Sequence, residues 1–245
     1  MANDSDDASG THFLNHPEIK QLLTSALSTL VLESDRGAVL VGAAHVDLHL
    51  RMLFEAVFPR PMSKKELNRV LKYPGTLSSF SARADVAYLT RLIPRYLYDA
   101  INHLRAVRNA VAHSPDSFRL ADHEQRLRKM YELGPGVPAA VNRWAGEVII
   151  HTAVKNILKV KDPTSEEEKT AFDTPQEALD FISGRPELMA VLEERRPRYE
   201  LALGVGLVCG LIVFHREKAK EVLGDDKVIS SLTRHESHPP QDGDS

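Results

Sequence analysis

Helical spacing of apolar residues runs through almost the whole chain, and this periodicity restricts the fold more than any other feature. Between residues 35 and 57, for example, Val39, Val46, Leu50 and Leu53 recur at intervals of seven, four and three residues. Such intervals place side chains on one face of an α-helix. No run of alternating β-branched residues is bounded by hairpin turns. The sequence therefore predicts an all-α protein, a single bundle of about eight to ten helices.

Prolines and capping motifs set the ends of the predicted helices. Ser63 and Thr174 each begin a capping box that is completed by a glutamate three residues later, Glu66 and Glu177. Pro94 suits the first turn of the helix that ends at His113, since its missing N–H has no helical partner there. The predicted helices cover residues 17–32, 35–57, 63–72, 81–93, 94–113, 118–133, 138–160, 174–184, 186–196 and 198–223.

The two ends of the chain differ from the rest in composition. Residues 1–11 and 225–245 are polar and lack hydrophobic periodicity, so we predict disordered tails there. Residues 12–224 then form one helical domain. Within it, residues 161–172 are highly charged and are typical of an exposed linker.

Overall charge and the apolar segments restrict location and partners. A net charge of −3 and a pI near 6.4 do not indicate a generally basic surface for nucleic acid, although a local basic face could still bind it. The single Cys209 lies in an apolar run and is typical of a buried, unreactive thiol in a reducing compartment. The apolar segment 201–214 is shorter than the roughly 20 residues that span a bilayer. We expect a cytoplasmic protein with no membrane span, in which this segment is a core helix.

The segment 104–113, which reads LRAVRNAVAH, contains an arginine on the apolar side of a helix. Arg108 falls on the same stripe as Leu97 and Ile101 when each residue advances by about 100°. A desolvated guanidinium needs an acidic partner, because leaving it alone costs several kcal/mol. Asp47 and Asp85 are the candidates. This geometry predicts a buried structural ion pair between Arg108 and one of them.

A catalytic role for the same segment is the alternative interpretation. Arg108 and His113 lie about 140° apart on an ideal helix, whereas Asn109 and His113 share a side. A frayed last turn or a helix from a second subunit would be needed to bring Arg108 and His113 to one substrate. There, His113 could act as general acid or base and Arg108 could stabilise charge on a phosphate, as in metal-independent RNA cleavage. Alternatively, His113 caps the last carbonyls of its helix.

Metal and cofactor sites have little support in the sequence. His45 and His49 have the four-residue spacing of a chelating pair, with Asp47 between them, but no third strong ligand follows at a motif spacing. An exposed polar stripe is the simpler interpretation. There is no phosphate-binding glycine loop, nucleophile elbow or catalytic carboxylate pair. We therefore expect no metal and no cofactor.

Residues 75–88 and 104–113, taken together in order and spacing, resemble the mannitol operon repressor family. Residues 42–48 and 198–203 are similar to its flanking helices. The resemblance covers about residues 17–216, with residues 120–184 poorly matched, which implies an insertion there. The motif residues of the first stretch are Ser79, Phe80, Ser81, Arg83, Asp85 and Tyr88.

The resemblance implies a helical, self-associating regulator of a sugar-alcohol operon, expected as a homodimer. Because the sequence has no helix-turn-helix signal and its basic clusters are scattered, we expect regulation through a protein partner. The Arg-Asn-x-x-x-His piece also resembles the HEPN superfamily, which implies a HEPN-like core. In that alternative, Arg108, Asn109 and His113 form a composite endoribonuclease site across a dimer. Our prediction is a binding protein rather than an enzyme, with a toxin-like ribonuclease as the alternative.

Overall fold

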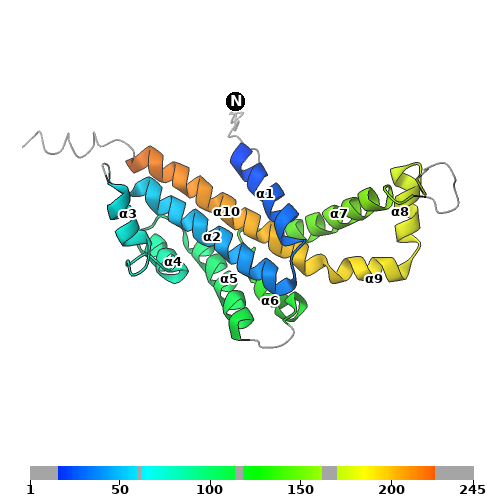
Figure 1. Cartoon of the computed structure of the whole chain (residues 1–245), viewed down its shortest axis with the longest axis horizontal. Coiled ribbons are helices and arrows are strands. Elements are labelled where there is room, and N and C mark those ends of the chain that lie inside the picture. The colour runs from blue at the N-terminus through cyan, green and yellow to red at the C-terminus, as the bar shows by residue number, and fades with distance from the viewer. Residues whose placement is uncertain (1–15, 60–61, 114–117, 162–169, 224–245) are drawn as a thin grey trace, which may run out of the picture.

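Helices form all the regular secondary structure in the described part of the chain. The computed structural model describes residues 16–59, 62–113, 118–161 and 170–223 (Figure 1). The all-α prediction is confirmed. The predicted disordered tails, residues 1–11 and 225–245, lie outside the described residues. The helices are α1 (Pro17–Leu30), α2 (Asp35–Val57), α3 (Lys64–Leu71), α4 (Phe80–Leu89), α5 (Arg95–His113), the 3-10 helix η2 (Leu120–His123), α6 (Glu124–Met130), α7 (Val137–Ile157), α8 (Pro175–Ser183), α9 (Pro186–Glu194) and α10 (Arg196–Leu223).

Two helices at the centre of the bundle, α2 and α10, lie side by side, and α1 packs against α10 (Figure 1). Glycines allow the close approach. A Cβ on Gly42 would lie 3.0 Å from Val205 Cγ2, and one on Gly206 would lie 2.8 Å from Leu23 Cδ2. Residues 199–210 of α10 are all buried. The predicted core helix within the apolar segment is therefore present.

Both central helices are long and apolar enough to cross a membrane by length and composition. The most apolar window of α2 is 50% buried inside the protein, and that of the continuous helical stretch 186–223 is 78% buried. Core helices of folded domains meet the same criteria. These two helices are therefore weak evidence for a membrane.

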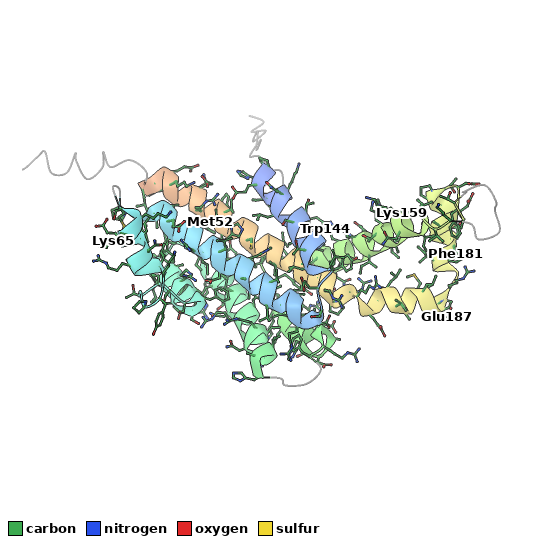
Figure 2. The ribbon with its side chains drawn as sticks, viewed as in Figure 1. Met52, Lys65, Trp144, Lys159, Phe181 and Glu187 are labelled. Atoms are coloured by element: carbon green, nitrogen blue, oxygen red, sulfur yellow. The ribbon has the colours of Figure 1, made fainter. Side chains whose placement is uncertain are left out.

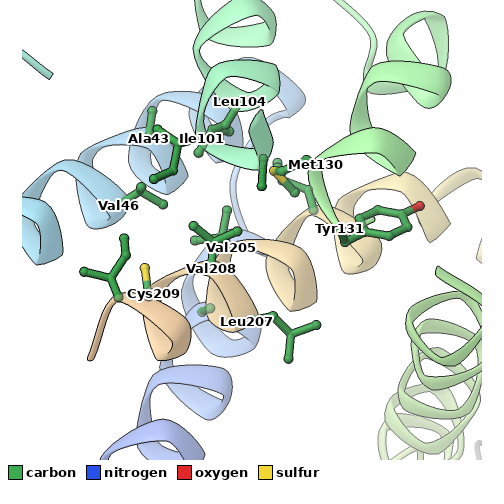
Figure 3. Close-up of a cluster of buried hydrophobic side chains, with 14 of the residues drawn as sticks. Ala43, Val46, Ile101, Leu104, Met130, Tyr131, Val205, Leu207, Val208 and Cys209 are labelled. Carbon is green, nitrogen blue, oxygen red and sulfur yellow. The ribbon is translucent and has the colours of Figure 1, made fainter. Parts of the chain in front are cut away.

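The second layer of the bundle is formed by α4, α5 and α6, below α2 in Figure 1. Its apolar side chains meet those of α2 and α10. Cys209 is 2% exposed, and burial raises the pKa of its thiol well above the ordinary value, so the predicted unreactive thiol is confirmed as buried. Figure 3 shows the cluster formed by Ala43, Val46, Ile101, Leu104, Met130, Val205, Val208 and Cys209.

A helical arm, which we define as α7, α8 and α9, extends from the bundle with α8 at its tip (Figure 1). In Figure 2, Lys159 and Phe181 lie towards the tip, and Trp144 lies towards the base. The insertion expected over residues 120–184 stays a prediction. Leu120 and Leu127 within it are almost fully buried in the core. Only its later helices project.

The helix ends agree with the sequence in most places, but α4 ends at Leu89 rather than at the predicted residue 93. Pro94 directly precedes α5, as predicted. The predicted helix 118–133 is instead a short 3-10 helix followed by α6. Pro197 does not divide two helices as expected. It lies in the first turn of α10, where a proline removes no helical hydrogen bond, and α9 ends at Glu194.

Candidate functional site

The motif at the start of α4 attaches this helix to α2 through a buried ion pair. Ser79 Oγ accepts a hydrogen bond from the Ala82 N–H at 3.1 Å and so caps the helix. The Arg83 side chain donates from Nε to Asp47 Oδ1 at 2.8 Å and from Nη2 to Asp47 Oδ2 at 2.6 Å. Its Nη1 donates to the Leu77 carbonyl at 2.6 Å. Arg83 is only 6% exposed, so this bidentate pair is largely desolvated.

A second polar network joins α4 to α5. Arg105 donates from Nη2 to Ser81 Oγ at 2.6 Å and from Nη1 to Asp85 Oδ1 at 3.3 Å. The Tyr98 hydroxyl donates to the same Asp85 oxygen at 3.0 Å. The rings of Tyr88 and Tyr98 stack with centroids 4.5 Å apart. The polar residues of the family motif thus hold the bundle together rather than line a cleft.

The prediction of a buried pair between Arg108 and Asp47 or Asp85 is wrong. Arg108 is exposed, and the two aspartates pair with Arg83 and Arg105 instead. The stripe of apolar residues on α5 wrongly placed Arg108 on the buried side, because the helices that pack against α5 change along its length. α4 starts opposite Arg105 and does not reach Arg108, whereas the last turns of α5 pack on α6 through residues such as Val107.

The three residues of the proposed catalytic motif lie at the C-terminal end of α5. Arg108, Asn109 and His113 are all exposed. No described residue forms an ion pair or hydrogen bond with the side chain of Arg108 or His113. Residues 114–117, which follow, lie outside the described residues. The described residues of one chain therefore bring no second group to this end of α5, and the catalytic role stays a prediction.

Sequence reasoning missed Arg83 although a signal for it was present. Phe80, Arg83, Ala84 and Ala87 recur at intervals of three, one and three residues, which places the arginine on the buried face of α4. Asp47 had been recognised at the edge of the apolar stripe of α2. Combining the two stripes would have identified the pair.

A third polar cluster lies between α1, α2 and α10. Arg216, which is 7% exposed, donates to Glu18 Oε2 at 2.9 Å. His49 is 8% exposed, and its Nδ1 has no hydrogen-bond partner. Burial lowers the pKa of His49, Arg216 lowers it further, and Glu18 opposes the shift. Burial also lowers the pKa of His215, whose Nε2 lacks a partner.

The histidine pair considered for metal binding is not arranged as a chelate. Asp47, between His45 and His49, is bound by Arg83, and His49 is buried against α10. Among the described residues, no group of three or more His, Cys, Asp or Glu side chains could hold a metal ion.

Comparison with protein-family models, curated proteins and solved structures finds no match. The resemblance to mannitol operon repressors therefore rests on residues 75–88 and 104–113, with residues 42–48 and 198–203 as flanking helices, and the resemblance to the HEPN superfamily rests on residues 108–113. The structure assigns the polar side chains of the first stretch to scaffolding and leaves the end of the second exposed.

Replacing Arg83 and Arg108 separately tests which arginine stabilises the bundle. We expect Arg83→Met to lower the free energy of unfolding by about 3 kcal/mol, because it leaves the Asp47 carboxylate without its partner. Arg83→Lys should recover only part of this loss, since an ammonium cannot form the bidentate pair. Arg108→Met should change stability by less than about 0.5 kcal/mol. Urea unfolding measures all three, and equal losses for Arg83→Met and Arg108→Met would contradict this assignment.

The buried histidines predict a loss of stability in mild acid. The pKa values of His49 and His215 are lowered from 6.5 in the folded protein. Below that pH the unfolded chain therefore binds more protons than the folded chain, and the free energy of unfolding falls as pH falls. The urea midpoint should decrease between about pH 7.5 and 5.5. A His49→Gln/His215→Gln variant should show a shallower dependence and His151→Gln an unchanged one; identical slopes in all three would contradict the explanation.

Proposed function

We propose that this chain is a regulatory binding protein whose helical arm engages a protein partner. The observation that carries the proposal is the composition and exposure of α9. This helix contains Leu188, Met189, Val191 and Leu192, yet none of its residues is buried. Val191 is 48% exposed. Apolar side chains that gather on one face of a projecting helix are typical of a surface for another macromolecule.

The charges on α8 and α9 favour a basic partner. Neither α8 nor α9 contains a lysine or an arginine between its first and last residue. Complementary charge on a partner would increase its association rate and select against acidic competitors. The occupant that fits is an amphipathic helix with an apolar stripe flanked by Lys or Arg. The acidic residues of the two helices are Glu177, Asp180, Glu187, Glu193 and Glu194.

The type of regulation is proposed from the sequence resemblance. Similarity to mannitol operon repressors supports a cytoplasmic homodimer that controls transcription. The net charge of −3 does not require direct binding to DNA. The arm gives such a regulator a way to act through a protein instead of through base contacts.

A defined peptide tests the arm without an identified partner. We expect the full-length protein to bind a synthetic peptide of Leu and Lys in which the leucines recur at helical spacing and form one apolar face. A peptide with Glu in place of every Lys should bind at least ~10-fold more weakly. Leu188→Ser/Val191→Ser should weaken binding of the Lys peptide by ~10-fold, because the apolar contact is lost. Fluorescence anisotropy measures both.

The matched control for this experiment is Val222→Ser, which removes an apolar side chain that is 74% exposed on α10, away from the arm. It should bind the peptide as the unmodified protein does. If the control and the arm variant lose affinity equally, or if both peptides bind equally well, the arm is not the docking surface.

A metal-independent endoribonuclease is the second candidate. It is favoured by the exposure of Arg108, Asn109 and His113 at one end of α5, where a second copy could approach. In that dimer, His113 of one chain would take the proton of an RNA 2′-hydroxyl, which attacks the adjacent phosphate and expels the 5′-oxygen. Arg108 of the other chain would stabilise the charge on the phosphate.

Cleavage of single-stranded RNA distinguishes this candidate from the first. If it is right, purified protein cuts RNA without added metal, and His113→Ala reduces the rate by at least ~100-fold because the general base is lost. His151→Ala, a change at an exposed histidine of α7, should leave the rate unchanged. Gel analysis of end-labelled RNA is the measurement. Absence of cleavage by the unmodified protein at high loading would rule out the ribonuclease.

A further inference from the structure

A pocket of about 330 Å³ lies where α6, α7 and α10 meet, at the base of the arm. Its polar lining comes from all three helices: Glu124 and Arg128 from α6, Asn142 from α7, and Glu200 from α10, with Tyr131 directly after α6. This volume is at the small end of the range for ligand sites. The pocket therefore suits a compact molecule with a few polar groups.

The carboxylate of Glu200 is the distinctive group in this pocket. Glu200 is 4% exposed, and its two oxygens accept hydrogen bonds from the Tyr131 hydroxyl at 2.8 Å and from Asn142 Nδ2 at 2.9 Å. No lysine or arginine among the described residues forms an ion pair with it. The buried guanidinium groups of Arg83 and Arg216, by contrast, each have an acidic partner.

The two neutral donors satisfy only part of what a buried carboxylate requires. A carboxylate has about four acceptor positions, and here two are filled. Burial and the hydrogen bond to Glu200 raise the pKa of Tyr131 far above its ordinary value, so its hydroxyl remains a donor. A buried charge is stable when it is both hydrogen-bonded and paired with an opposite charge. Arg196 interacts electrostatically with Glu200, but among the described residues no cation forms an ion pair with its carboxylate. The missing element at Glu200 is therefore a cation in direct contact.

The surrounding packing holds these groups in place. A Cβ on Gly204 of α10 would lie 3.2 Å from Tyr131 Cδ1, so only a glycine lets the ring pack this closely against the helix. Figure 3 shows Tyr131 at the edge of the apolar cluster, with its hydroxyl directed away from the cluster. The Asn142 backbone carbonyl accepts from Arg196 Nη1 at 3.1 Å, which ties the start of α7 to α10. The polar groups therefore occupy fixed positions before any ligand arrives.

We propose that this pocket binds a small organic cation, with an ammonium or guanidinium group that pairs with Glu200. Tyr131 and Asn142 orient the carboxylate towards it. Glu124 supplies a second acidic side chain, and Arg128 is the one basic residue in the lining, so the lining has an acidic balance. The proposal does not depend on the function of the arm, although the bound cation would contact helices that belong to both the bundle and the arm.

Titration of the full-length protein with n-butylammonium tests the pocket directly. We expect saturable binding with a dissociation constant on the order of 1 mM, which is reasonable for a ligand with so few atoms. Backbone amide signals of α6, α7 and α10 should shift in NMR spectra at constant ionic strength. 1-Butanol and butyrate, which match the chain length without the positive charge, should produce no saturable shift. Absence of saturation with n-butylammonium, or equal shifts with 1-butanol, would overturn the proposal.

Three variants assign the binding to Glu200. Glu200→Gln should weaken n-butylammonium binding at least ~10-fold, because the counter-charge is lost while the shape is retained. Arg128→Gln should strengthen binding several-fold, since it removes a like charge from the lining. Glu187→Gln makes the same change on α9, outside the lining, and should have no effect.

Arg128 is exposed, so its replacement keeps the test informative if Glu200→Gln does not fold. Weaker cation binding in Arg128→Gln would show that the pocket does not select positive charge. A loss in Glu187→Gln equal to that in Glu200→Gln would show that the cation binds by overall charge alone. Either result would overturn the proposal.

Discussion

Close packing of α2 against α10 is the contact on which the rest of this structure depends. Gly42 lets the two helices approach until Val205 lies against the α2 backbone, and residues 199–210 are buried on every side as a result. A helix that is apolar all round needs neighbours on all faces. Here α1, α2, α5, α6 and α7 supply them. These five helices are thus arranged around α10, the last helix of the described residues, rather than stacked in sequence order.

Ion pairs of restricted geometry determine where the outer helices attach to this centre. Arg83 and Asp47 join α4 to α2, and Arg216 and Glu18 join α10 to α1. Near the start of α2 and of α10, Arg198 Nη2 donates to Asp35 Oδ1 at 2.9 Å. The second oxygen of Asp35 accepts a hydrogen bond from the Leu120 N–H at 2.8 Å. Apolar packing alone allows helices to slide or rotate, whereas a bidentate arginine does not. The charged residues therefore contribute to the choice of one arrangement, beyond their contribution to stability.

The sequence was sufficient to predict where the helices lie along the chain, but not which helices pack against one another. Periodicity and capping residues are local, and they placed α2, α5 and α10 correctly to within a few residues. The side of α5 that faces the core depends on which helix covers each turn, and that information is not local. Arg108 was therefore assigned to the core although α4 ends its contact with α5 at Arg105. The pocket at Glu200 could not be anticipated for the same reason, since its lining joins the consecutive helices α6 and α7 with Glu200 of α10, which follows Asn142 by 58 residues.

The exposed end of α5 and the pocket at Glu200 differ in how far one chain completes them. At α5, the motif residues have no partners among the described residues, and the ribonuclease alternative places a second copy of the chain there. At Glu200, the donors are in place, and no cation among the described residues forms an ion pair with the carboxylate. A cation bound there would lower the cost of burying this carboxylate and would hold α6 and α7 against α10. Because α7 is also the first helix of the arm, occupation of the pocket would restrict how the arm leaves the bundle. The geometry thus places the proposed cation site at the base of the arm that is proposed to engage a partner.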